Sequence, residues 1–115
     1  MELNVSRHGD VPVFRLKGRL SVAGADELEK QVVQSIDAGA KRLLFVLDDL
    51  DYISSAGLRV FYVGIKKLNN DGSGFCFCGL KPAVRSIFDV VGLTPSVRLY
   101  ATEQEALGQL AAVPN

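Results

Sequence analysis

The chain has 115 residues, which suits one compact domain and is too short for two, since domains usually run from about 50 to 250 residues. Its 13 basic residues balance its 13 acidic residues, so the positive field that attracts nucleic acids or anionic membranes is missing. The start of the chain has no basic segment followed by an apolar run, and no apolar stretch approaches the roughly 18 residues of a membrane span. We therefore expect a single cytoplasmic domain over residues 1–115, ordered at about 2–112, with neither nucleic acid nor membrane as a partner.

The first part of the chain has the pattern of a hairpin followed by a helix. Residues 3–5 and 11–17 are strand-like, and the turn-forming residues 8–10 separate them, which predicts an antiparallel pair. Apolar residues then recur at helical spacing over residues 25–38, and Gly39 is a suitable helix end.

A continuous apolar run at residues 43–47 predicts the central strand, covered on both faces. The acids Asp48 and Asp49 follow it, and we expect the strand to end there. Helical spacing returns over residues 55–68, which residues 69–72 close with turn chemistry.

The next strand, residues 75–78, contains the two cysteines of the chain. Cys76 and Cys78 are two positions apart, so their side chains share one face of a strand. A lone C-x-C pair supplies two thiolates, and no histidine or second cysteine pair stands nearby to complete a zinc site. We interpret the cysteines as buried or half-buried free thiols and expect neither a metal nor a cofactor.

The last part of the chain predicts a helix, a short strand and a second helix. Pro82 opens a helix that Gly92 can end, a strand covers residues 97–99, and Thr102 with Glu105 has the capping-box pattern of a helix start. Residues 114–115 look like a loose tail. The order of elements predicts an α/β fold in which a mixed sheet of about five strands, with an opening hairpin, packs against about four helices.

Residues 51–58 join the central strand to the second helix and combine acids, two hydroxyls and a glycine. If Ser54 is the N-cap, the residue three positions later is Gly57, which has no side chain to reach back to the cap. Backbone N–H groups would then remain available to an anion at Ser55, where the helix dipole also favours negative charge. Helix capping alone is the alternative explanation for the two serines.

Three kinds of chemistry fit this segment poorly. A hydrolase nucleophile elbow would need a glycine where Ile53 stands, and the only histidine, His8, lies in the opening hairpin. A phosphoryl-accepting receiver site at Asp48 would also need acids after an earlier strand. No phosphate-binding glycine loop of the G-x-x-x-x-G-K type occurs. We therefore expect no catalytic residues and no enzyme activity.

The segments described above resemble the STAS family, named for sulfate transporters and anti-sigma-factor antagonists, and in particular its stand-alone bacterial members. The resemblance covers nearly the whole chain and is carried by residues 18–20, 47–48, 53–58, 88–93 and 105–107. It implies the STAS fold. In that family the turn before the second helix commonly reads Asp-Ser-Ser-Gly-Leu, and its first serine is phosphorylated by an anti-sigma factor that is also a kinase.

Matching the glycine and leucine of that motif to Gly57 and Leu58 places the phosphorylated serine at Ser55. Ser54 stands where the family often has aspartate, Ala56 where it often has the second serine, and Ser21 where sporulation-type members carry another aspartate. The resemblance implies an antagonist that binds an anti-sigma factor and serine kinase when unphosphorylated, with a serine phosphatase to reverse the modification. The alternative is a STAS adaptor that is never phosphorylated, as in a stressosome or a lipid-transport complex.

The partner-binding surface implied by the resemblance is the turn, the exposed side of the helix that follows it, and the loop that the family places beside the turn. The turn and the loop comprise Ser21, Val22, Ser54, Ser55, Ala56, Gly57 and Leu58. We expect a side chain added at Gly57 to stand against the docked partner and to leave the stability of the fold unchanged or slightly raised.

Overall fold

The structure is a computed structural model that describes residues 1–68 and 73–112. The elements in chain order are β1 (Glu2–His8), β2 (Val11–Leu20), α1 (Val22–Asp37), β3 (Leu43–Ile53), α2 (Ser55–Leu68), β4 (Phe75–Cys78), α3 (Pro82–Val90), the 3₁₀ helix η1 (Thr94–Ser96), β5 (Arg98–Tyr100) and α4 (Glu103–Ala112). The predicted helix closure at residues 69–72 and the predicted tail at residues 114–115 lie outside the described residues.

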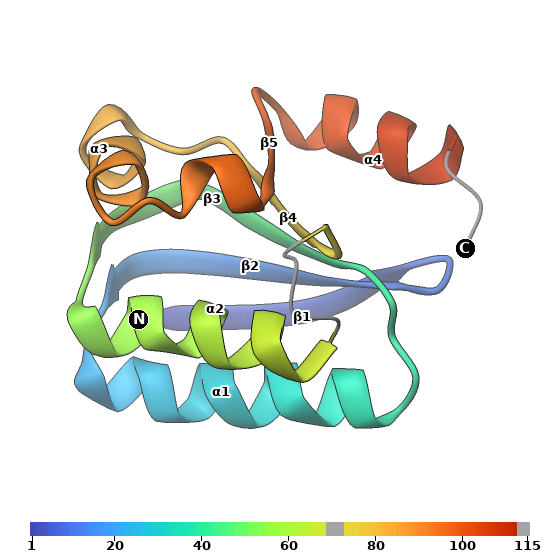
Figure 1. Ribbon diagram of the computed structural model, residues 1–115, viewed down its shortest axis with the longest axis horizontal. Coiled ribbons are helices and arrows are strands. Elements are labelled where there is room, and N and C mark those ends of the chain that lie inside the picture. Colours follow the sequence, from blue (N-terminus) through green and yellow to red (C-terminus); the bar gives the residue numbers. More distant parts are fainter. Residues whose placement is uncertain (69–72, 113–115) are drawn as a thin grey trace.

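The strands form one sheet in the order β1-β2-β3-β4-β5. β1 is antiparallel to β2, and the other neighbouring pairs are parallel. Helices α1, α2 and α3 contribute to the core on one face of the sheet, and α4 covers part of the other face. Figure 1 shows α1 and α2 on the side of the sheet opposite α4. The predicted α/β fold with an opening hairpin, a mixed sheet and a central third strand is confirmed.

The larger core is built around Phe45 of β3 and the aromatic rings that pack against it. Phe45 stacks on Phe14 and on Phe77 with ring centroids 5.0 Å apart in each pair, and it meets Phe61 of α2 edge-on at 5.1 Å. All four rings are fully buried. Offset and edge-on aromatic contacts of this kind stabilise a core beyond the area that they bury.

The smaller core lies between the sheet and α4. Leu44 and Val46 of β3 and the thiols Cys76 and Cys78 of β4 are buried there against Leu110 and its neighbours on α4. The central strand is therefore covered on both faces, and the cysteines are buried free thiols, as the sequence predicts. Burial raises the pKa of Cys76 to about 11 and that of Cys78 to about 12, so both thiols are protonated at neutral pH.

Strand β3 is longer than the sequence predicts, because it continues through Asp48 and Asp49 to Ile53. The two acids are exposed, whereas Leu50 and Ile53 are buried, so the segment packs against the core along one side only. Pairing of β3 with β4 reaches only the pair Val46↔Cys78, while pairing with β2 continues to Leu20↔Ile53. The last residues of β2 and β3 therefore form a two-stranded extension of the sheet, the β2–β3 extension, which spans residues 17–20 and 49–53.

Candidate functional site

Ser54 follows the β2–β3 extension directly and starts α2. Its side-chain oxygen accepts a hydrogen bond of 3.1 Å from the backbone N–H of Gly57, and its carbonyl oxygen accepts the N–H of Leu58 at 3.0 Å. Ser54 is therefore the N-cap of α2, and its hydroxyl is occupied by the helix that it caps.

Ser55, the first residue of α2, is placed differently. It is exposed, and its hydroxyl makes no hydrogen bond within the described part of the chain. The N–H groups of Ser55 and Ala56 precede the first intrahelical hydrogen bond, so they remain available to a ligand or a partner. Ser54 thus caps the helix, and Ser55 presents a free hydroxyl at its start.

The loop after β2 lies beside this helix start. The backbone N–H of Ser54 donates a 2.9 Å hydrogen bond to the carbonyl oxygen of Leu20, whose next residue is Ser21. Ser21 is exposed, and Val22, the first residue of α1, is 67% exposed. Figure 1 shows α1 and α2 starting at the same end of the sheet. The structure therefore brings Ser21, Val22, Ser54 and Ser55 together.

Gly57 and Leu58 are placed differently from the expectation. Both are buried, and a Cβ at Gly57 would lie 3.0 Å from Ile53 Cγ1 and closer still to Leu20. The expectation that a side chain at position 57 would face a partner is wrong, because this face of the first turn packs on the end of β2. Ala56 is half-buried and packs against the same core.

Two polar contacts flank the site on the β2–β3 extension. Lys81 Nζ lies 2.5 Å from Asp51 Oδ1, and this ion pair lowers the pKa of the Asp51 carboxyl below its usual value. The guanidinium of Arg19 lies 4.2 Å from the ring centroid of Tyr52, a cation–π contact on the surface. The charge of Asp51 is thus balanced by a neighbour rather than left beside Ser55 alone.

An exposed stripe on α2 continues from Ser55, on the side of the helix that is expected to belong to the partner-binding surface. Ser55, Arg59, Tyr62 and Lys66 are all exposed, and their spacing places them along one side of the helix. The hydroxyl of Tyr62 donates a 3.1 Å hydrogen bond to the carbonyl oxygen of Val91, at the end of α3. The sequence predicts that the exposed side of this helix takes part in binding, and the structure shows which residues lie on it. We call these four residues the α2 stripe.

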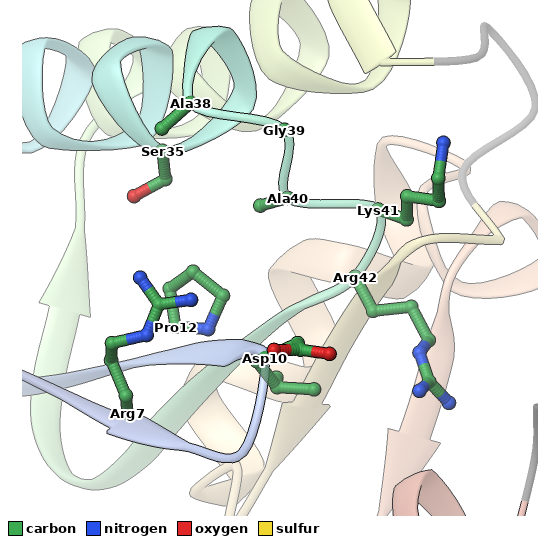
Figure 2. A pocket seen from close by; sticks show the side chains of 10 residues that line it. Arg7, Asp10, Pro12, Ser35, Ala38, Gly39, Ala40, Lys41 and Arg42 are labelled. Atoms are coloured by element: carbon green, nitrogen blue, oxygen red, sulfur yellow. The ribbon is translucent and has the colours of Figure 1, made fainter. Parts of the chain in front are cut away.

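The opposite end of the sheet contains a cavity of about 290 Å³ between the hairpin and the segment after α1. Figure 2 shows that Lys41 and Arg42 on its rim point away from it, so the basic groups do not converge on one ligand. His8 also lies at this end, paired with Val11 at the hairpin, so the single histidine is remote from Ser55 and does not serve it as a base.

The described residues contain neither a metal-ligand cluster nor a membrane-spanning helix. Among residues 1–68 and 73–112, no group of three or more His, Cys, Asp or Glu side chains is placed to hold a metal ion. Over the same residues, no helix is both long enough and apolar enough to cross a bilayer. The exposed side chains around the start of α2 include the hydroxyls of Ser21 and Ser55, the apolar Val22 and the basic Arg59.

Comparison with known proteins identifies the family and the fold. Residues 2–106 match the family described as the STAS domain. The chain belongs to the STAS family. The match runs from β1 to the middle of α4, so it includes every element that positions Ser55.

Several relatives of this STAS domain have names that describe a regulatory role. BtrV of Bordetella bronchiseptica, named as an anti-sigma factor antagonist, is 35% identical over 92% of this chain and 90% of its own length. The anti-sigma F factor antagonist of Paenibacillus polymyxa is 26% identical over 98% of this chain and 97% of its own. Among solved structures, the anti-sigma factor antagonist SpoIIAA in its unphosphorylated form has a TM-score of 0.80 at 18% identity, covering 97% of this chain and all of that one. These likenesses confirm the STAS fold.

Proposed function

We propose that this STAS domain is an anti-sigma factor antagonist that binds an anti-sigma factor when Ser55 is unphosphorylated and releases it when Ser55 is phosphorylated. The anti-sigma factor would also be the serine kinase, and a serine phosphatase would restore the binding state. The domain would act in the cytoplasm and free a sigma factor by occupying its inhibitor. Binding at this surface needs no chemistry by the domain itself, so the proposal makes it a regulator and not an enzyme.

The observation that carries this proposal is the division of roles between the two serines. Ser54 caps α2 through its own side chain, so the helix does not depend on the hydroxyl of Ser55. Ser55 is exposed and its hydroxyl is free, which a kinase needs in an acceptor. The names of the relatives BtrV and the Paenibacillus protein support the same role.

The electrostatics of the helix start explain how a phosphate could act without unfolding the domain. Phosphorylation adds about −1.5 to −2 charges at neutral pH, and a helix N-terminus stabilises negative charge. Asp51, the acid of β3 that is closest to Ser55 in the sequence, is already paired with Lys81. A partner surface that fits a neutral hydroxyl would instead meet a buried, unpaired charge, which costs roughly 2 to 5 kcal/mol in interfaces. This cost weakens the binding of the partner and leaves the stability of the free domain unchanged.

The fold itself is compatible with both states. The Bacillus cell fate determinant SpoIIAA in its phosphorylated form has a TM-score of 0.77 with this chain at 21% identity, covering 95% of this chain and 99% of that one. The phosphorylated and unphosphorylated SpoIIAA structures therefore share this architecture, which supports a switch at the surface.

The test combines mass spectrometry with binding calorimetry. The purified chain is incubated with ATP and the anti-sigma factor of the source organism, and the phosphate is located by mass spectrometry. Ser55→Ala should bind the anti-sigma factor and resist modification, whereas Ser55→Asp should bind more weakly by about tenfold or more, since its carboxylate enters the interface unpaired.

Ser6→Asp is the matched control, because Ser6 is exposed on β1, away from α2, and the change adds the same charge. It should bind like the wild type. Phosphate on another residue, with Ser55→Ala still modified, would contradict the assignment of Ser55. Intact binding without any phosphorylation would favour the STAS adaptor that is never phosphorylated.

A further inference from the structure

The end of α3 carries an exposed apolar step beside the α2 stripe. Val90, the last residue of α3, is 85% exposed, and Val91, which follows it, is 41% exposed. Tyr62 of the stripe is 43% exposed and is hydrogen-bonded to the backbone of Val91. This bond joins α2 to the backbone at the end of α3, so the exposed Tyr62 and the exposed valines lie on neighbouring parts of two helices.

This apolar step is held in place before any partner arrives. The carboxylate of Asp89 accepts hydrogen bonds from Thr94 Oγ1 at 2.5 Å and from Arg85 Nε at 3.2 Å, which tie the end of α3 to the following turn. Leu93, two residues after Val91, is buried in the core. A surface fixed in this way loses little conformational entropy when it is covered.

The distance between Ser55 and Tyr62 is short enough for one docked partner to cover both. Ser55 and Tyr62 are seven residues apart on one helix, which corresponds to about 10 Å along its axis. A protein interface of standard size covers about 800 Å² on each partner, a patch roughly 30 Å across. A partner that docks over Ser55 along α2 therefore reaches Tyr62 and the step beside it.

The charge of α2 indicates the chemistry of such a partner. The helix has no acidic residue and three basic ones, of which Lys67 is paired with Asp37 at 3.0 Å. Arg59 and Lys66 make no ion pair with any described residue and lie on the α2 stripe. Carboxylates are the complementary groups for these two cations.

We propose that the anti-sigma factor which docks over Ser55 also covers Val90 and Val91 with an apolar patch and presents carboxylates to Arg59 and Lys66. This inference rests on the proposed function and extends its surface from the start of α2 to the end of α3. A phosphate at Ser55 would then weaken binding in a second way. Arg59 lies one helical turn from Ser55, so the phosphate competes with the partner's carboxylates for the Arg59 guanidinium.

The test is a calorimetric titration of the purified anti-sigma factor of the source organism into Val90→Asp. The exposed site should tolerate the change, so the unfolding midpoint should stay near that of the wild type, while the affinity falls by about tenfold or more because a charge enters an apolar contact. Val5→Asp is the matched control, since Val5 is 43% exposed on β1, and it should bind like the wild type. Hydrogen exchange should show protection of amides 88–93 in the complex.

The outcomes separate this inference from the function on which it rests. If Ser55→Asp weakens binding while Val90→Asp and Val90→Ser bind like the wild type and amides 88–93 are not protected, the partner does not cover α3 and the inference is overturned. If neither Ser55→Asp nor Val90→Asp weakens binding, both the inference and the proposed function fail. Weaker binding by Val90→Asp with a normal Val5→Asp supports the extended surface.

Discussion

Leu20 fills the space into which a side chain at Gly57 would project, since a Cβ there would lie 2.7 Å from Leu20 Cγ and 2.8 Å from Leu20 Cδ2. Leu20 is fully buried at the end of β2, so it has little room to move away. Glycine at position 57 thus allows the first turn of α2 to approach the end of β2 closely.

Gly57→Ala should therefore destabilise the fold, although alanine is the better helix former. Overpacking of a core costs about 1 to 3 kcal/mol, and the gain in helix propensity is about 1 kcal/mol. We expect the free energy of unfolding, measured in urea, to fall by about 1 kcal/mol. The double variant Gly57→Ala/Leu20→Ala should lose less free energy of unfolding than the two single variants lose together, because the smaller side chain at position 20 makes room for alanine at position 57. Strict additivity would show that the two positions do not meet.

The two serines before and at the start of α2 should differ in their effect on stability. Ser54→Ala removes the oxygen that accepts the Gly57 N–H and should lower the free energy of unfolding by about 1 kcal/mol. Ser55→Ala removes a hydroxyl without a described hydrogen bond and should leave it within about 0.5 kcal/mol of the wild type. Equal losses in parallel denaturant titrations would mean that the cap is shared.

Leu44→Ala should destabilise the protein by about 2 to 5 kcal/mol, because it leaves a cavity in the small core beneath α4. The apolar faces of the central strand and of its covering helices predict a buried core that includes Leu44, Val46, Phe61, Ile65 and Phe88, and all five are buried. An unfolding midpoint equal to that of the wild type would contradict the packing of α4 on this face.

The two buried thiols should make the fold less stable in alkaline solution. The pKa of Cys76 and of Cys78 lies above the ordinary 9.0 in the folded state, because burial disfavours the thiolate. Between about pH 9 and the raised values of about 11 and 12, the unfolded chain loses these protons while the folded chain keeps them. Stability should therefore fall as pH rises through this window, by up to about 1.4 kcal/mol per pH unit for each thiol.

Cys76→Ala/Cys78→Ala is the comparison for this effect, since it removes both thiols and leaves the other titrating groups in place. Its stability should fall less steeply between pH 9 and 10.5 than that of the wild type. The thiols of the native wild type should also react slowly with a thiol reagent at pH 8 and quickly after denaturation. Parallel pH curves for the two proteins would rule out the thiols as the cause.

Local patterns in the sequence predict most of the fold. The spacing of apolar residues over 55–68 predicts α2 with the bounds that the structure shows, and the apolar run at 75–78 does the same for β4. The pattern fails for the end of β3, because an acid pair after an apolar run usually marks a strand end. Here the strand continues along β2 beyond its last pair with β4, and its acids are exposed while Leu50 and Ile53 are buried. A register shift between Gly18 and Arg19 lets these two residues, three positions apart, both pack on the core.

The candidate site is predicted in part. The position of Ser54 as a cap follows from local chemistry, and the structure shows the bond that it makes. The burial of Gly57 depends on Leu20, which is distant in sequence, so the motif alone does not reveal which way position 57 faces. Its spacing four residues before the buried Phe61 is the local signal that would have placed it on the inner side of the helix.

The β2–β3 extension limits where residues can be inserted or deleted in this fold. Its two strands end side by side, at Leu20 and Ile53, and each leads directly into a residue of the candidate site. An inserted or deleted residue in either strand would shift one loop by about 3.3 Å and reverse the side chains that follow it. Ser21 and Ser55 could then no longer face the same partner, so changes of length should be confined to the far end of the sheet, at the hairpin and after α1.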